Sequence, residues 1–160
     1  MNMRDSRPDL RVIGRTFPVT APRKSAPMQL RHLERYQAGL RAALRIMTAL
    51  LFMEHGLAKL VHFPVPHPGV PDPLPAILVA AAWIELVGGA LIAIGLFTRA
   101  VAFLAAGEMA TGYFLFHFPQ GFWPIVNMGE AAILYCFVFL YLAAAGPGVF
   151  SVDAALEKKG

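Results

Sequence analysis

Four hydrophobic stretches fill most of the chain beyond residue 40, and each of them carries a glutamate well inside it. These residues are Glu54, Glu85, Glu108 and Glu130. A carboxylate at the centre of a bilayer costs about 2.5 to 3.5 kcal/mol on insertion scales, so four of them are not expected on lipid-facing helices. We therefore predict that the four carboxyl groups share a polar interior between packed helices.

The composition excludes an ordinary soluble domain. Of the 160 residues, 57% are hydrophobic and 15% are charged, whereas about a quarter of the residues are charged in soluble domains. Because a membrane-spanning helix takes about 20 residues, four spans leave no room for a separate catalytic domain. The sequence predicts an all-α integral membrane protein, a four-helix bundle whose first partner is the lipid bilayer.

Prolines and hydrophobic periodicity divide the chain. Residues 1–27 contain four prolines among arginines and no apolar period, which predicts a disordered basic tail. Leucines spaced by three and four residues after Met28 predict a surface helix that leads into the first span. The expected four-span domain covers residues 28–153, and residues 154–160 form a second tail. The predicted spans cover approximately residues 40–61, 75–96, 100–118 and 125–145.

The distribution of Lys and Arg predicts the orientation of these spans. Of the 14 basic residues, ten precede the first span or lie at its mouth, Arg99 joins spans two and three, and two lysines lie near the chain end. The connections over residues 62–74 and 118–124 contain none. Because cytoplasmic flanks collect basic residues, both termini are predicted to face the cytoplasm.

Eight polar side chains are candidates for one ligand-binding site that opens toward the outer face. The rise of about 1.5 Å per helical residue places Glu85 and Glu108 nearest the middle of the membrane. Buried charges without a partner are costly, so we expect at least one glutamate to be neutral at pH 7 and able to donate a hydrogen bond to a polar headgroup. The candidate residues are Glu54, His55, Lys59, Glu85, Glu108, His117, Asn127 and Glu130.

A purely structural role stays open for these residues. Polar side chains inside membranes also join helices, with each interhelical hydrogen bond contributing about 0.6 kcal/mol. Lys59 has the alternative of extending its ammonium group to the outer surface. His62 and His67, in the proline-rich connection, are expected to be solvated. Gly88 and Gly89 are expected to allow close helix contact one turn after Glu85.

Other chemistry finds little support in the sequence. His55 and His117 are able to ligate a haem or metal only if their helices face one another, and their spacing matches no ligand motif, so no metal site is predicted. The single cysteine, Cys136, lies in an apolar run and is expected to be a small buried apolar residue rather than a reactive thiol. The net charge of +4 lies beside hydrophobic segments, where lipid headgroups and topology explain it, so nucleic-acid binding is not expected.

Several segments together resemble the DoxX family of small four-span membrane proteins. The resemblance runs in order from about residue 40 to residue 153 and leaves out the basic tail. It rests on HGLAKL at 55–60, IELVGGALIAIGLFTR at 84–99, HFPQGFWP at 117–124, NMGEAAILY at 127–135 and GPGVFSVD at 146–153. The positions that fall on the family pattern are His55, Gly56, Lys59, Glu85, Gly88, Gly89, Thr98, Arg99, Asn127, Glu130, Gly146 and Pro147.

This resemblance implies a four-helix bundle in the bacterial inner membrane more firmly than it implies an activity. The family includes a subunit associated with thiosulfate oxidation coupled to quinone, and members linked to oxidative and thiol stress. Our leading hypothesis is a quinone- or small-redox-molecule-binding subunit of a membrane oxidoreductase. Two alternatives stay open: a proton-coupled transporter for a small solute, which would need a homo-oligomer for alternating access, and a scaffold that recruits soluble redox enzymes through its basic tail.

Overall fold

The computed structural model describes residues 11–12, 15–16 and 31–158, in two units, Met1–Arg35 and Tyr36–Gly160. In the first unit, β1 (Arg11–Val12) pairs antiparallel with β2 (Arg15–Thr16), and α1 (Arg31–Glu34) follows. Most of the predicted disordered tail, residues 1–27, lies outside the described residues. The predicted domain boundaries at residues 28 and 153 therefore stay predictions.

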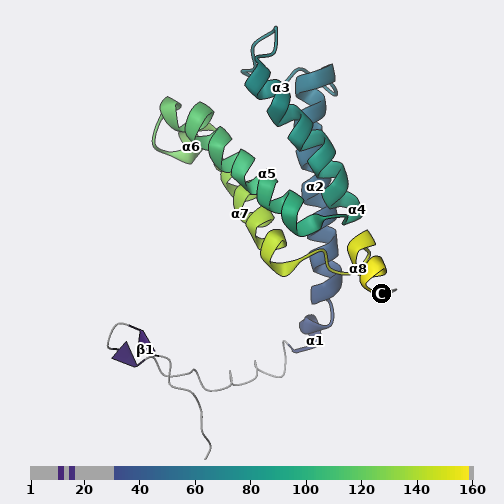
Figure 1. Cartoon of the computed structure of the whole chain (residues 1–160). Helices are drawn as coiled ribbons and strands as arrows, with labels where there is room; N and C mark the ends of the chain where they lie inside the picture. The colour runs from purple at the N-terminus through teal and green to yellow at the C-terminus, as the bar shows by residue number, and fades with distance from the viewer. Residues whose placement is uncertain (1–10, 13–14, 17–30, 159–160) are drawn as a thin grey trace, which may run out of the picture. The chain divides into compact units, whose positions relative to one another are not determined.

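The described part of the second unit is helical and begins with α2 (Gln37–Val61), which is 25 residues long. A continuous helix over Ala76–Ile94 follows, composed of α3 (Ala76–Trp83), the π-helical turn η1 (Ile84–Gly88) and α4 (Gly89–Ile94). Figure 1 shows this helix running alongside α2, and the two make extensive contacts. Pro75 precedes the first turn of this helix and Gly95 follows its last turn.

The second half of this unit repeats the pattern of paired helices. The next helix covers Thr98–Gln120 and consists of α5 (Thr98–Gly112), η2 (Tyr113–His117, a π-helical turn) and η3 (Phe118–Gln120, 3-10). A short α6 (Pro124–Asn127) leads to α7 (Glu130–Ala145), which packs along α5, and α8 (Val152–Glu157) ends the described chain. In the described residues, Ala76–Ile94 and Thr98–Gln120 are long and apolar enough to cross a membrane, and α7 is a shorter apolar helix.

Small residues bring α2 and η1 into backbone contact. A Cβ atom at Gly56 would lie 2.7 Å from the carbonyl oxygen of Ala82 and 2.9 Å from the amide nitrogen of Leu86. A Cβ atom at Gly89 would likewise lie 3.0 Å from the carbonyl oxygen of Ala49, which bears out the expected close contact at that glycine. This close approach sets the helix that carries Lys59 directly against the turn that carries Glu85.

An apolar core then joins the two pairs of helices. Its buried side chains come from α2, α4, α5 and α7, and the rings of Phe52 and Phe139 meet edge to face with centroids 4.7 Å apart. The core lies toward the end of the bundle where α4 ends and α5 begins. The polar side chains of α2, η1 and α5 therefore lie between this core and the opposite end of the bundle.

Candidate ligand-binding site

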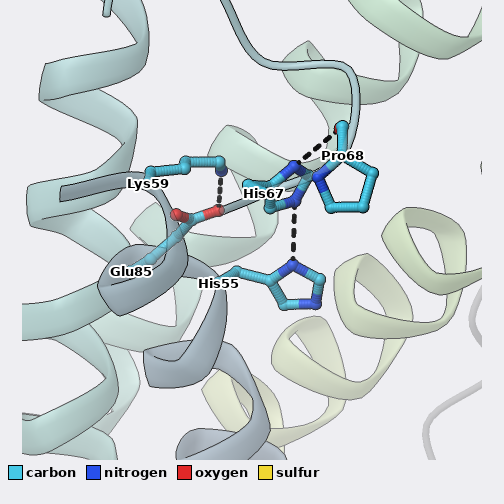
Figure 2. Close-up of polar contacts among 5 residues, drawn as sticks. All are labelled: His55, Lys59, His67, Pro68 and Glu85. Atoms are coloured by element: carbon cyan, nitrogen blue, oxygen red, sulfur yellow. Dashed lines mark hydrogen bonds and ion pairs between the residues drawn. The ribbon is translucent and has the colours of Figure 1, made fainter. Parts of the chain in front are cut away.

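Lys59 and Glu85 form a buried ion pair between α2 and η1. The ammonium group donates a hydrogen bond to Oε1 of Glu85, and the side chains are 10% and 1% exposed, respectively (Figure 2). Lys59 thus turns inward instead of extending to the surface. Glu85 sits in a π-helical turn, a local widening of the helix that often occurs at functional sites.

Glu108 on α5 adds a second carboxyl group to this pair. Its charge interacts with those of Glu85 and Lys59, although it comes from the other pair of helices. Oε2 of Glu85 and Oε2 of Glu108 are both buried, and neither has a hydrogen-bond partner. We call Lys59, Glu85 and Glu108 the carboxyl site. It holds two carboxyl groups against one ammonium group, so it retains a capacity to take up a proton or a hydrogen-bond donor.

His55 lies one helical turn before Lys59 and contacts a histidine from the connection between α2 and α3. Nδ1 of His55 lies 3.2 Å from Nε2 of His67, and Nδ1 of His67 lies 3.0 Å from the carbonyl oxygen of Pro68 (Figure 2). The ring of Tyr135 on α7 meets His55 edge-on at 5.8 Å. The expectation of a solvated His67 is wrong, because this side chain is half-buried. His62 is exposed, as expected.

The environment of His67 favours its neutral form. Burial is the largest factor that lowers the pKa of His67, and the positive charges of Lys59 and His117 lower it further, against the opposing effect of the Pro68 carbonyl. The net pKa lies below the ordinary histidine value. At neutral pH, His67 is therefore a neutral hydrogen-bonding group.

Asn127 and His117 build the turn between α5 and α7. The Asn127 side chain donates to the carbonyl oxygen of Gly121 at 2.6 Å and accepts from the amide of Gly129 at 2.8 Å. Nδ1 of His117 lies 2.9 Å from the carbonyl oxygen of Asn127. These contacts support a structural role for both residues. Their predicted part in ligand binding stays a prediction.

Glu54 and Glu130 do not join the carboxyl site. Both residues are exposed, so the expectation that all four glutamates are buried together is wrong for these two. Glu54 precedes His55 by one residue, and this step of about 100° turns it away from the face that carries Lys59. Glu130 begins α7, where a carboxylate complements the positive end of the helix dipole. Their predicted ligand contacts stay predictions.

The sequence analysis missed a second group of charged residues, at the end where α4 ends and α5 begins. We call Arg41, Arg45, Arg99 and Asp153 the guanidinium pole. Arg45 is fully buried and donates to the carbonyl oxygens of Ile92 and Ala93, each at 2.6 Å, and to that of Phe150 at 2.8 Å. It therefore adds donors to carbonyl groups in the last turn of α4, where helical hydrogen bonds run out.

The other members of the guanidinium pole hold the ends of α5 and α7. Arg99 donates to the carbonyl oxygens of Ala143 and Ala144, and Arg41 donates to that of Ala145 at 3.0 Å. The Asp153 carboxylate accepts from the amides of Phe97 and Thr98 at 2.9 and 3.0 Å, at the start of α5.

Glycines give these arginines room. Gly95 and Gly146 have φ values of 72° and 81°, and a Cβ atom at either position would lie 2.8 Å from a guanidinium nitrogen. An open groove of about 400 Å³ lies beside Arg99 and Asp153. Because those side chains already hold helix ends, the groove is a weaker candidate for a ligand than the carboxyl site. Three or more His, Cys, Asp or Glu side chains placed to hold a metal ion do not occur among residues 11–12, 15–16 and 31–158.

The fold and the site together define a class of protein, a helical bundle with a buried lysine–carboxyl cluster. Comparisons with known proteins define the family. The family model described as DoxX matches residues 40–118. An uncharacterized protein of Haemophilus influenzae is 42% identical over 137 residues, which are 81% of this chain and 100% of that relative. The inner membrane protein YqjF of Escherichia coli K12 is 33% identical over 123 residues, 72% of this chain and 90% of YqjF.

The chain belongs to the DoxX family and is a helical membrane protein. No solved structure gives a significant match to it. The resemblance motifs at residues 127–135 and 146–153 lie beyond the part that the family model matches.

Proposed function

We propose that this DoxX-family protein binds quinone, or a similar small redox molecule, in the carboxyl site. We propose further that it is an inner-membrane subunit associated with a membrane oxidoreductase or with an oxidative or thiol stress response. Its four spans would place both termini in the cytoplasm and the carboxyl site in the outer half of the bilayer. The basic residues near the termini support this orientation. The name of the relative, inner membrane protein YqjF, supports the inner-membrane location.

The observation that carries the proposal is the unpaired, buried oxygen of Glu85. A buried acceptor without a donor costs about 1 to 3 kcal/mol, and a carboxyl group in a membrane interior is rarely placed without a function. Glu85 is 1% exposed and uses one of its two oxygens for Lys59. A quinol hydroxyl is a donor that suits the free oxygen.

The oxidised form of the ligand would bind in the same site by accepting hydrogen bonds instead of donating them. A quinone carbonyl accepts hydrogen bonds, and the Lys59 ammonium group has three donors, of which the hydrogen bond to Glu85 uses one. Glu108 stands close enough to interact with both charges and is suited to exchange a proton with the ligand. The carboxyl site thus offers groups for both redox forms of one headgroup.

The test is a binding titration with ubiquinone-1 on the full chain in detergent, followed by tryptophan fluorescence. Replacing Glu108 by Gln keeps the shape and removes the charge, and we expect about tenfold weaker binding, because hydrogen bonds to charged groups contribute about 1.5 to 3 kcal/mol. Glu130→Gln is the matched control and should bind as the wild type does. Equal affinity in all three proteins would refute the proposed site.

The scaffold alternative depends on the basic tail, residues 1–27, most of which lies outside the described residues. Deleting this segment tests it separately from ligand binding. If soluble redox enzymes are recruited through the tail, a pull-down with the shortened chain loses them while ubiquinone-1 binding is unchanged. Retention of every partner would eliminate the tail as the docking element.

A further inference from the structure

The connection between α2 and α3, residues 62–74, is attached to the bundle near its middle by one histidine pair. Most of its residues are exposed, and His67 is one of the few that turn inward. His67 joins this connection to α2 through a hydrogen bond between its Nε2 and Nδ1 of His55. Loss of this contact would remove the hydrogen bond by which His67 holds residues 62–74 to α2.

The hydrogen-bond pattern fixes the tautomers of the pair. The carbonyl oxygen of Pro68 is an acceptor, so Nδ1 of His67 must carry the proton, and Nε2 of the neutral ring is left as an acceptor. Nδ1 of His55 then donates to it. Protonation of His67 would place an N–H group on Nε2, directly against the N–H group of His55. In this arrangement of protons the contact requires a neutral His67, because a protonated His67 keeps it only if His55 moves its own proton from Nδ1 to Nε2.

The charges around the pair act in the same direction. Lys59 acts on both histidines, and His117 from η2 acts on His67. Tyr135 from α7 faces His55 through its ring edge. Glu85 and Glu108 lie next to Lys59, where Glu85 holds the ammonium group by a direct hydrogen bond. The charges of Lys59 and His117 would thus oppose a proton added to His67, whereas Glu85 and Glu108 carry the opposite sign and lie next to Lys59.

We propose that the His55–His67 hydrogen bond is an acid-sensitive latch that holds residues 62–74 beside the carboxyl site and releases them when His67 is protonated. The latch itself is independent of what binds below it. That its opening admits the ligand rests on the proposed function. The device would make binding respond to the acidity of the compartment that residues 62–74 face.

The direction of the pH response follows from the environment of His67. Its pKa is lowered by burial first and by Lys59 and His117 next, so the closed state favours the neutral ring. The stabilisation is therefore complete above the ordinary histidine value of about 6.5 and is lost as the pH falls below it toward the lowered pKa. Acidification opens the latch, and alkaline conditions keep it closed.

The test uses a spin label on the full chain in lipid nanodiscs. Pro71 is exposed, and Pro71→Cys in a Cys136→Ala background carries the label. We expect the mobile fraction of the label to rise severalfold between about pH 8 and about pH 5, because protonation of His67 favours the open state. His67→Gln, which does not titrate, should abolish this response, and His55→Phe should give a mobile label at every pH.

His62→Asn is the matched control, because His62 is exposed and Asn tolerates its positive φ of 57°. This variant should keep the wild-type response. A label whose mobility ignores pH in the wild type, or responds equally in His67→Gln, would overturn the latch.

The ligand experiment separates this inference from the proposed function. If the latch admits the ligand, the association rate of ubiquinone-1 rises severalfold over the same pH range, in parallel with label mobility. An association rate that ignores pH while the label responds refutes gating and leaves quinone binding intact. A responding label in a protein that binds ubiquinone-1 at no pH refutes the proposed function and leaves the latch intact.

Discussion

The two ends of the helical unit bury charged side chains in different ways. At the guanidinium pole, Arg41, Arg45 and Arg99 donate to helix-end carbonyls and Asp153 accepts from helix-start amides. In the carboxyl site, Lys59 holds one oxygen of Glu85, while the second oxygen and that of Glu108 have no donor. The charged groups of the guanidinium pole form hydrogen bonds with the backbone. The carboxyl site keeps two carboxyl oxygens without a hydrogen-bond donor.

This difference distinguishes charges that serve the fold from charges that serve a ligand. Helix ends carry partial charges and unsatisfied groups, so an arginine or aspartate placed there stabilises the structure directly. A carboxyl oxygen left unpaired in the interior destabilises the empty protein. Substitutions at the guanidinium pole should therefore lower stability, whereas neutralising Glu108 should lower affinity. The predictions below test this division, from the largest expected effect to the smallest.

Replacing Arg45 by Met should give the largest loss of stability. It removes the three hydrogen bonds that the fully buried guanidinium donates, although the Ile92 carbonyl keeps the Gly95 amide as a donor. We expect a loss of about 4 kcal/mol, measured by thermal unfolding in detergent. Arg45→Lys, which keeps the charge but not the planar fork, should lose less. A wild-type melting temperature for Arg45→Met would show that the pole is not what holds these helix ends.

Breaking the ion pair of the carboxyl site should have the next largest effect. Lys59→Met leaves two buried carboxyl groups without a cation, and we expect a loss of about 3 kcal/mol in the free energy of unfolding. Adding Glu85→Gln to Lys59→Met should restore part of this loss, because the unpaired charge is removed. A double-mutant cycle measures the coupling. Strictly additive losses would mean that the two side chains do not interact in the membrane.

Adding a methyl group to the tight contact between α2 and η1 should have a smaller effect on stability. In Gly56→Ala, the added Cβ meets backbone atoms of Ala82 and Leu86, and overpacking of this kind costs about 1 to 3 kcal/mol. Gly107→Ala is the control, since a Cβ there meets nothing within 4 Å and alanine favours helices. Thermal unfolding of both variants gives the comparison. Equal stability of Gly56→Ala and Gly107→Ala would contradict the close packing of the helices.

Removing the charge of Asp153 should have the smallest effect, about 1 kcal/mol for a helix-start carboxylate. Burial raises the pKa of Asp153, but the Thr98 and Phe97 hydrogen bonds and the Arg45 charge outweigh it, so the pKa lies below the ordinary value. This stabilisation is present above about pH 4 and is lost as the pH falls through the lowered pKa. Asp153→Asn should therefore flatten the acid limb of a stability-against-pH curve. An acid limb identical to that of the wild type would exclude this role.

The helical segments could be predicted because their signals are local. Proline at the start and glycine at the end bound the helix over Ala76–Ile94, and its apolar run is long enough to read directly from the sequence. A buried position was also predicted for Glu85 and was one of two alternatives for Lys59, since both are polar residues in apolar segments. The π-helical turn at Glu85 has no local sequence signature of this kind and was not predicted.

The partners of these residues could not be predicted, because they depend on how the helices rotate and on where a connection folds back. The four glutamates all lie within apolar stretches of the sequence, yet Glu54 and Glu130 are exposed and Glu85 is buried. His67 contacts His55 only because its proline-rich connection returns to α2. Arg45 resembled a basic flank in the sequence, although its place about two turns inside α2 was a signal of burial.

Ligand-induced stabilisation in Glu108→Gln and Asp153→Asn tests the division between the two ends most directly. The melting temperature of each variant is measured with and without ubiquinone-1, because a bound ligand raises it in proportion to occupancy. We predict a crossed result: Glu108→Gln melts no lower than the wild type and loses the ligand shift, while Asp153→Asn melts lower and keeps it. A full ligand shift in Glu108→Gln would contradict the account.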